Sequence, residues 1–164
     1  MDNGYIHPLA VIDEGASIGR NVQVWAFAHI RSGAEVGDNT IIGERAYLGP
    51  DVEVGKNCKI QNGAQLFGPC RLGEGVFIGP GAILTNDKHP RATGESGAIL
   101  DVSGWFRSSI SIDSGASIGA GAILVAPVKI GSRAMIGAGS VVVRDVESGQ
   151  TVVGNPSRPI HSKK

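Results

Sequence analysis

The chain has 164 residues, a length suited to one domain with a buried core. Its 15 Lys and Arg residues balance its 15 Asp and Glu residues, so the net charge gives no reason to expect binding to nucleic acid or to an anionic membrane. The 25 glycines are about twice the usual share and indicate many tight turns around an apolar interior.

The N-terminal segment MDNGYIHPLA has neither the basic nor the apolar stretch of a secretion signal, and no later run approaches the ~18 apolar residues of a membrane span. We therefore expect a soluble, cytoplasmic protein. The two cysteines, Cys58 and Cys70, have no CxxC spacing, so the sequence indicates neither a disulfide framework nor a zinc site.

Aliphatic side chains recur at every sixth position from Ile6 onward. In the first block they are Ile6, Ile12, Ile18, Val24, Ile30, Val36, Ile42, Leu48, Val54, Ile60, Leu66, Leu72, Ile78 and Leu84. In the second block they are Ile112, Ile118, Leu124, Ile130, Ile136 and Val142. Six residues make one short strand and a turn, so this period predicts a parallel β-helix over residues 1–164 rather than α-helices or hairpins.

A second track of small residues lies two positions before the aliphatic one, as at Ala64 and Ala122. Because strand side chains alternate between faces, both tracks point into the same interior. Cys58 and Cys70 lie on the small track, so we interpret them as packing residues.

The period breaks between Leu84 and Ile112, whose separation is not a multiple of six. We expect an inserted loop at about 85–109, and a C-terminal tail segment at 145–164. Long loops on a rigid scaffold are often functional. This loop concentrates the chain's reactive and aromatic side chains: Asn86, Asp87, His89, Arg91, Trp105, Phe106 and Arg107.

Over nearly its whole length the repeat resembles the hexapeptide-repeat acyltransferases. The resemblance implies an all-β, left-handed parallel β-helix in which three hexapeptides make one 18-residue coil, and assembly as a homotrimer. The spacing of the repeat alone does not determine that the β-helix is left-handed. Residues 18 apart would then stack, so His29, Tyr47, Gln65 and Ile83 form one outward column that leads into the loop. Because this column mixes aromatic and polar groups, we expect subunits to meet there, with the sites at subunit interfaces.

Four local motifs narrow the resemblance: VQVWAFAHI, KIQNGAQLF, GAILTNDKHPRA and VVGNPSRPI. Together they are similar to those of the N-acetyltransferases that acetylate nucleotide-linked 3-amino-3-deoxy sugars for bacterial surface polysaccharides. The most specific motif is TNDxxPR, from Thr85 to Arg91. The resemblance implies acetyl-CoA as the donor and a UDP- or dTDP-linked amino sugar as the acceptor.

Amine chemistry ranks the candidate catalytic residues of this motif. A neutral amine is already nucleophilic, so it needs positioning and a hydrogen-bond acceptor more than a base. The side-chain carbonyl of Asn86 is such an acceptor, although it cannot take the proton. In the family that the motif resembles, this Asn is constant whereas the position of His89 varies. The resemblance and this chemistry together rank Asn86 first, His89 second as a base or orienting group, and Asp87 third.

The resemblance also implies binding residues. For the acceptor they are Gln61, Asn62, Gln65 and Arg91. For acetyl-CoA they are Ala120, Ala138, Val143, Arg144 and Arg158. The two arginines of the second set suit phosphate oxygens as charge-assisted donors.

Two other functions stay open. One is a sugar O-acetyltransferase like the maltose and galactoside enzymes, with His89 before Pro90 as general base; a hydroxyl gains ~10²–10⁴ in rate from such a base. The other is a non-catalytic structural β-helix. A γ-type carbonic anhydrase would need three histidines converging on zinc, including a pair five residues apart. The four histidines here contain no such pair and none stack 18 apart, so we expect no metal. These histidines are His7, His29, His89 and His161.

Overall fold

The computed structural model describes residues 4–100 and 107–160, and in these ranges every regular element is a short β-strand. Trp105, Phe106 and His161 therefore lie outside the described residues, as do parts of the expected loop and tail. None of the described segments forms a helix with the length and apolarity needed to cross a membrane.

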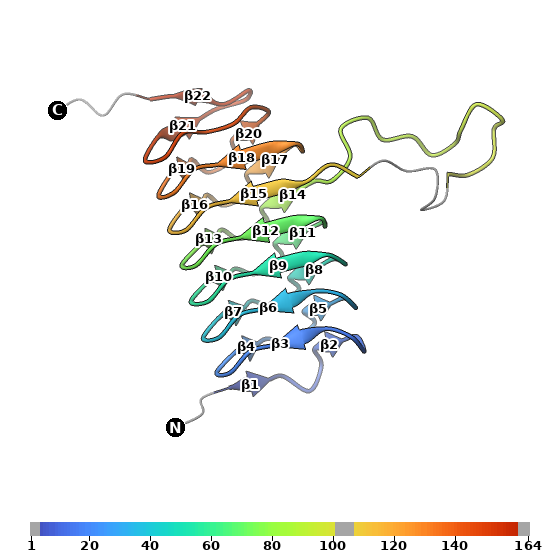
Figure 1. Cartoon of the computed structure of the whole chain (residues 1–164), viewed down its shortest axis with the longest axis vertical. Helices are drawn as coiled ribbons and strands as arrows, with labels where there is room; N and C mark the ends of the chain where they lie inside the picture. The colour runs from blue at the N-terminus through green and yellow to red at the C-terminus, as the bar shows by residue number, and fades with distance from the viewer. Residues whose placement is uncertain (1–3, 101–106, 161–164) are drawn as a thin grey trace.

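The strands build three sheets that wind around one axis (Figure 1). The first sheet contains β1 (Tyr5–Ile6), β4 (Gln23–Val24), β7 (Ile41–Ile42), β10 (Lys59–Ile60), β13 (Phe77–Ile78), β16 (Ser117–Ile118), β19 (Met135–Ile136), β21 (Thr151–Val153) and β22 (Arg158–Pro159). The second contains β2 (Val11–Ile12), β5 (His29–Ile30), β8 (Tyr47–Leu48), β11 (Gln65–Leu66), β14 (Ile83–Leu84), β17 (Ile123–Leu124) and β20 (Val141–Val142). The third contains β3 (Ser17–Ile18), β6 (Glu35–Val36), β9 (Val52–Val54), β12 (Cys70–Leu72), β15 (Ile110–Ile112) and β18 (Val128–Ile130).

From β1 to β21, each strand pairs in parallel with a strand one coil away. Val52 pairs with Cys70, for example, which is the spacing expected for a coil of three hexapeptides. Across the insertion Cys70 pairs with Ile110, so the loop lengthens one coil without shifting the alignment of the coils. In Figure 1 the third sheet faces the viewer, and its strands run from right to left while successive coils rise, so the helix is left-handed. The predicted left-handed parallel β-helix with one inserted loop is confirmed.

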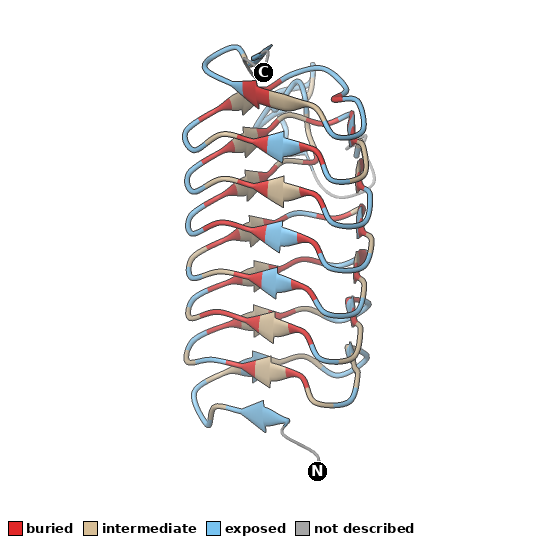
Figure 2. Cartoon of the chain, turned by 90° about the vertical axis from the view of Figure 1, so that its left-hand side faces the viewer, coloured by how far each residue is buried: buried red, intermediate tan, exposed pale blue. Residues whose placement is uncertain are grey.

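The aliphatic track fills the interior of the helix. Figure 2 shows buried positions alternating with exposed ones along each coil. Cys58 is 1% exposed and Cys70 is 3% exposed, which confirms that they pack in the core. Burial raises the pKa of both thiols, that of Cys70 to about 12, so neither is poised as a thiolate nucleophile.

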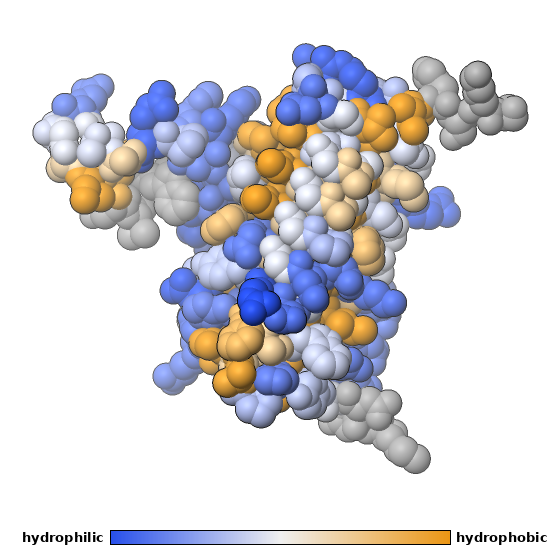
Figure 3. All heavy atoms as spheres, turned by 180° about the vertical axis from the view of Figure 1, so that it is seen from behind, coloured by the Kyte–Doolittle hydropathy of each residue, from blue (hydrophilic) through white to orange (hydrophobic). Residues whose placement is uncertain are grey.

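The two ends of the helix differ. At the C-terminal end, β22 pairs antiparallel with β21 and closes the last coil. At the N-terminal end, Ile6 is 52% exposed and Leu9 is 54% exposed, because no coil lies beneath them. Apolar side chains accordingly gather at this end in Figure 3, which shows the molecule from behind.

Candidate active site

The turns between sheets form the edges of the helix, and two edges carry the predicted site residues. We call the turns that join the first sheet to the second the first edge; it includes Gln61–Asn62 and Ala138. We call the turns that join the second sheet to the third the second edge; it includes Phe67–Gly68 and Thr85–Asn86. The inserted loop leaves from the second edge after β14 and projects to the side (Figure 1).

Asn86 is the anchored residue of this loop, and it is only 9% exposed. Its backbone oxygen accepts a hydrogen bond from Ser108 N at 2.8 Å, which brings the two ends of the loop together. Its side-chain Nδ2 donates to the carbonyl oxygen of Gly68 at 2.7 Å, one coil below. Asn86 is therefore held by both its backbone and its side chain.

The bond to Gly68 also fixes which way the Asn86 amide faces. A carbonyl oxygen can only accept, so the NH₂ group must face Gly68 and Oδ1 must face the other way. No described residue donates a hydrogen bond to Oδ1. Among the described side chains, every nitrogen or oxygen atom that is shielded from solvent has a hydrogen-bond partner. Oδ1 is therefore an acceptor that can be reached from outside.

Asn86 lines a hollow of about 370 Å³. The hollow is lined by Tyr47, Gly49, Pro50, Asp51, Phe67, Gly68, Asn86 and Arg107. Two rings form its apolar wall, with the centroids of Tyr47 and Phe67 5.4 Å apart. On another side Arg107 Nη1 donates to Asp51 Oδ2 at 2.8 Å. The hollow thus combines an aromatic surface, an ion pair and the anchored amide of Asn86.

The other motif residues do not line this hollow within a single chain. His89 is exposed, and its backbone N donates to Asp87 Oδ1 at 2.8 Å. Asp87 is half-buried. Arg91 is exposed, and its Nη1 donates to the carbonyl of Pro90 at 2.9 Å. The motif therefore places one side chain in the hollow and extends the rest along the loop.

The predicted acceptor-binding residues lie away from Asn86 in the same chain. Gln61 and Asn62 are on the first edge, where Asn62 Oδ1 accepts a hydrogen bond from Glu44 N at 3.0 Å. Asn62 also lines a separate hollow of about 360 Å³ with His7, Trp25, Ala26 and Glu44. Gln65 is on β11, on the outer face between the two edges, and its Nε2 lies 3.4 Å from the carbonyl of Gly63.

The predicted acetyl-CoA residues are divided in the same way. Ala120 and Ala138 are exposed and stacked on the first edge, where Gly139 N donates to Ala120 O at 2.8 Å. Val143 and Arg144 are exposed and directly follow β20, so they lie on the second edge. Arg158 is exposed in β22, and its Nη1 donates to Ser157 O at 2.9 Å. One chain therefore does not bring the predicted donor residues together.

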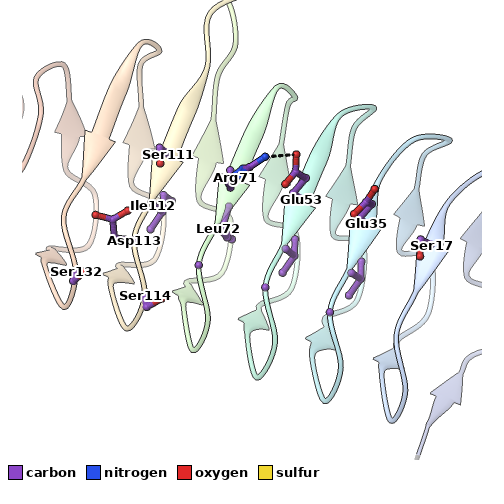
Figure 4. Close-up of a pocket in the computed structure, with 15 residues that line it drawn as sticks. Ser17, Glu35, Glu53, Arg71, Leu72, Ser111, Ile112, Asp113, Ser114 and Ser132 are labelled. Carbon is purple, nitrogen blue, oxygen red and sulfur yellow. Dashed lines mark hydrogen bonds and ion pairs between the residues drawn. The ribbon is translucent and has the colours of Figure 1, made fainter.

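A larger hollow, of about 490 Å³, lies on the outer face of the third sheet and holds none of the predicted site residues (Figure 4). Two of its charged groups pair with one another: Arg71 Nη2 donates to Glu53 Oε1 at 2.8 Å, where the two side chains are 70% and 46% exposed. Within the described ranges, no three His, Cys, Asp or Glu residues are grouped as metal ligands.

Sequence reasoning missed two contributors to the Asn86 hollow. Gly68 supplies the carbonyl that orients the amide, and Asp51 pairs with Arg107 at its rim. Gly68 precedes Asn86 by one full coil, so the repeat contained a signal for it. Asp51 could be placed on the same edge by the same counting, but nothing in the repeat indicated its partner.

Comparison with solved structures finds fold relatives of known chemistry. The acetyltransferase domain of PglB from Neisseria gonorrhoeae FA1090 is 27% identical, with a TM-score of 0.63, over 96% of this chain and 57% of that one. PerB from Caulobacter crescentus, in complex with CoA and GDP-perosamine, is 26% identical, with a TM-score of 0.58, over 96% and 57% of the two chains. AntD, an N-acyltransferase from Bacillus cereus, is 21% identical with a TM-score of 0.64, over 99% and 81%, and shows the shared fold alone.

A curated relative matches over a shorter stretch. The acyl-[acyl-carrier-protein]–UDP-N-acetylglucosamine O-acyltransferase of Brucella anthropi is 45% identical over 40 residues, which are 24% of this chain and 14% of that protein. The chain thus spans 57% of the PglB and PerB chains and a small part of the curated relative. The family described as bacterial transferase hexapeptide (six repeats) matches residues 15–50, 33–68, 51–86 and 109–144. Since these matches cover more than half of the sequence, the chain belongs to the hexapeptide-repeat family of bacterial transferases.

Proposed function

We propose that this chain transfers an acetyl group from acetyl-CoA to the amino group of a nucleotide-linked 3-amino-3-deoxy sugar, for bacterial surface polysaccharide synthesis in the cytoplasm. The observation that carries the proposal is the anchoring of Asn86, which lines the hollow and whose NH₂ group donates to Gly68, so that Oδ1 is left as the acceptor of this amide. Relatives of this fold support the choice of substrates, since PerB was solved with CoA and GDP-perosamine and the PglB domain with acetyl coenzyme A.

The reaction needs a hydrogen-bond acceptor near the amine but no catalytic base. The neutral amine attacks the thioester carbonyl, the C–S bond breaks, and the proton that leaves nitrogen passes to the CoA thiolate. Asn86 Oδ1 accepts an N–H of the amine and so directs the lone pair toward the thioester. Burial of Asn86 limits competition from water for this hydrogen bond.

A homotrimer would complete the site. The predicted residues are divided between the first edge, with Asn62 and Ala138, and the second edge, with Asn86 and Arg144. If the second edge of one copy faces the first edge of the next, the two halves meet, and cyclic symmetry repeats the contact three times. In this arrangement acetyl-CoA lies along the C-terminal coils, which carry the predicted donor residues.

The test is turnover, followed as free thiol released from acetyl-CoA with UDP- and dTDP-linked amino sugars and with maltose as acceptors. We expect thiol release with the amino sugars. Asn86→Ala should lower kcat by about 10- to 100-fold, since it removes a buried hydrogen-bonding group at the reacting centre.

His89→Ala is the matched comparison, because His89 is in the same loop but outside the hollow. It should reduce kcat less than Asn86→Ala, with both variants the same size as wild type by light scattering. Turnover with maltose alone, or a larger loss from His89→Ala in intact assemblies, would instead support the O-acetyltransferase with His89 as its base.

A further inference from the structure

Aromatic side chains extend from the Asn86 hollow toward the N-terminus. The Phe67 and Tyr47 centroids are 5.4 Å apart, and those of Tyr47 and His29 are 5.9 Å apart in an edge-to-face arrangement. Tyr47 and His29 are paired residues of neighbouring strands, so the row follows the stacking of the coils. It forms a continuous surface leading away from Asn86 along one chain.

The row ends at a guanidinium that its neighbours hold in place. Arg31 Nε donates to Asp13 Oδ2 at 2.8 Å, and Arg31 Nη1 lies 3.4 Å from the hydroxyl of Tyr47. His29 Nε2 donates to the other carboxylate oxygen of Asp13 at 2.9 Å. These hydrogen bonds, that from His29 first and then that from Arg31, hold the pKa of Asp13 below its ordinary value. The bond to Asp13 likewise raises the pKa of Arg31, so the pair stays charged.

Arg31 keeps donors available for a ligand. A guanidinium has five N–H groups, and described residues accept from only Nε and, weakly, Nη1. The end formed by Nη1 and Nη2 can therefore meet a phosphate in the two-bond geometry that arginine favours. The side chain is 41% exposed, so a ligand can reach it.

The distance between Arg31 and Asn86 suits the proposed sugar nucleotide. Tyr47, which Arg31 contacts, is on β8, two coils below β14 and the start of the loop. Coils stack ~4.8 Å apart, so a phosphate at Tyr47 and Arg31 would be about 10 Å from an amine at Asn86. In a 3-amino sugar the amine nitrogen and the first phosphorus are five bonds apart, which is shorter than this distance. The phosphate that suits Arg31 is therefore the second one, next to the nucleoside.

We propose that Arg31, Tyr47 and Phe67 form the subsite for the nucleoside diphosphate of the acceptor, with Arg31 binding a phosphate and the two rings supporting the sugar. Asp13 is the positioning residue of Arg31. This inference rests on the proposed function, because that function supplies the acceptor. It also gives the acceptor a direction: its amine at Asn86 and its nucleotide toward the N-terminal coils, opposite to acetyl-CoA.

Binding of UDP, dTDP and inorganic pyrophosphate to the full chain, measured by titration calorimetry without acetyl-CoA, tests the subsite. Arg31→Ala should weaken binding of the nucleoside diphosphates by about 10- to 100-fold, as expected for a charge-assisted contact. Arg31→Lys keeps the charge but not the two-bond geometry, so its affinity should lie between those of Arg31→Ala and wild type. Pyrophosphate should lose affinity in parallel, since its contact is with the guanidinium.

Arg71→Ala is the matched control, because Arg71 is also an exposed arginine paired with a carboxylate, but on the third sheet. It should bind as wild type does. Equal affinities for Arg31→Ala and Arg71→Ala would overturn the subsite. Loss of binding that coincides with a smaller assembly in both Arg31→Ala and Arg31→Lys would also overturn it, and would assign Arg31 to a subunit contact. Nucleotide binding that depends on Arg31 in a chain that releases no thiol would leave the subsite standing and reject the proposed acetyl transfer.

Discussion

At the scale of single residues, the turn after β16 contains two glycines that are needed for different reasons. A Cβ at Gly119 would lie 2.5 Å from Ala138 N and 2.7 Å from the carbonyl carbon of Gly137, which is backbone of the coil above. Gly121 has φ of 65° and nothing within 4 Å of its added Cβ, so only its left-handed conformation disfavours a side chain. Phe27 and Arg45 adopt the same conformation on the first edge, so the repeat tolerates that strain.

These two positions give a paired prediction. Gly121→Ala should destabilise the fold by about 1 kcal/mol, the usual cost of a left-handed residue with a Cβ. Gly119→Ala should cost at least about 2 kcal/mol, since backbone in the next coil must shift to relieve the clash. Urea unfolding followed by far-UV circular dichroism measures both. A greater loss for Gly121→Ala than for Gly119→Ala would show that conformation, and not coil spacing, limits this turn.

Only some properties of Asn86 could be predicted from the sequence. The motif and the chemistry of amines predicted a role for this residue from the sequence. Its orientation came only from the structure, because that depends on the Gly68 carbonyl, which the preceding coil presents. Side-chain direction is a property of packing between coils, and the motif alone does not contain it.

At the scale of the strands, the six-residue period was sufficient to predict the architecture. Each strand is two or three residues long, and the aliphatic residues of the repeat point inward. The six-residue count alone therefore predicted the position of nearly every strand. The C-terminal end of the β-helix departs from this period. Thr151 pairs with Met135, a shorter offset than that of a regular coil, and β22 then turns back antiparallel. The period stops at Val142, so it could not predict this closure.

A solenoid whose coils contact only their neighbours should be unevenly stable along its axis. Ile60 is fully buried in a central coil, whereas Ile6 is 52% exposed in the first one. Ile60→Ala should therefore cost about 2–5 kcal/mol, the range for a buried large-to-small change. Ile6→Ala should cost less than about 1 kcal/mol, because little of its side chain is removed from water.

The unfolding free energies of the two variants in urea provide the measurement. Hydrogen exchange gives an independent check, since amides of the first coil should exchange faster than those of β10. Similar losses for Ile60→Ala and Ile6→Ala would mean that the N-terminal end is covered in solution, by a second copy or by another part of the protein.

At the scale of the whole molecule, the division of the candidate site between two edges is the main finding that the sequence did not foresee. Counting coil by coil could have placed Asn62 and Ala138 on one edge and Asn86 on another. Which edges meet is decided by the surfaces of two chains together, and no period within one chain encodes that. Under the proposed homotrimer this division implies a specific arrangement, in which the first edge of one copy lies against the second edge of the next.

This arrangement predicts that two impaired variants complement each other. Asn86→Ala damages only the second edge, and Ala138→Trp should block the acetyl-CoA path only on the first edge, where Ala138 is exposed. In trimers mixed at random from equal amounts, about one quarter of the sites would combine two intact edges, so thiol release should recover to that fraction of wild type. Mixing Asn86→Ala with a double variant carrying both changes is the control, since every site then lacks an intact second edge. Thiol release near one quarter of wild type in the first mixture, with only the residual activity of Asn86→Ala in the control, requires a site shared between subunits. Residual activity alone in both mixtures would instead place the whole site within a single chain.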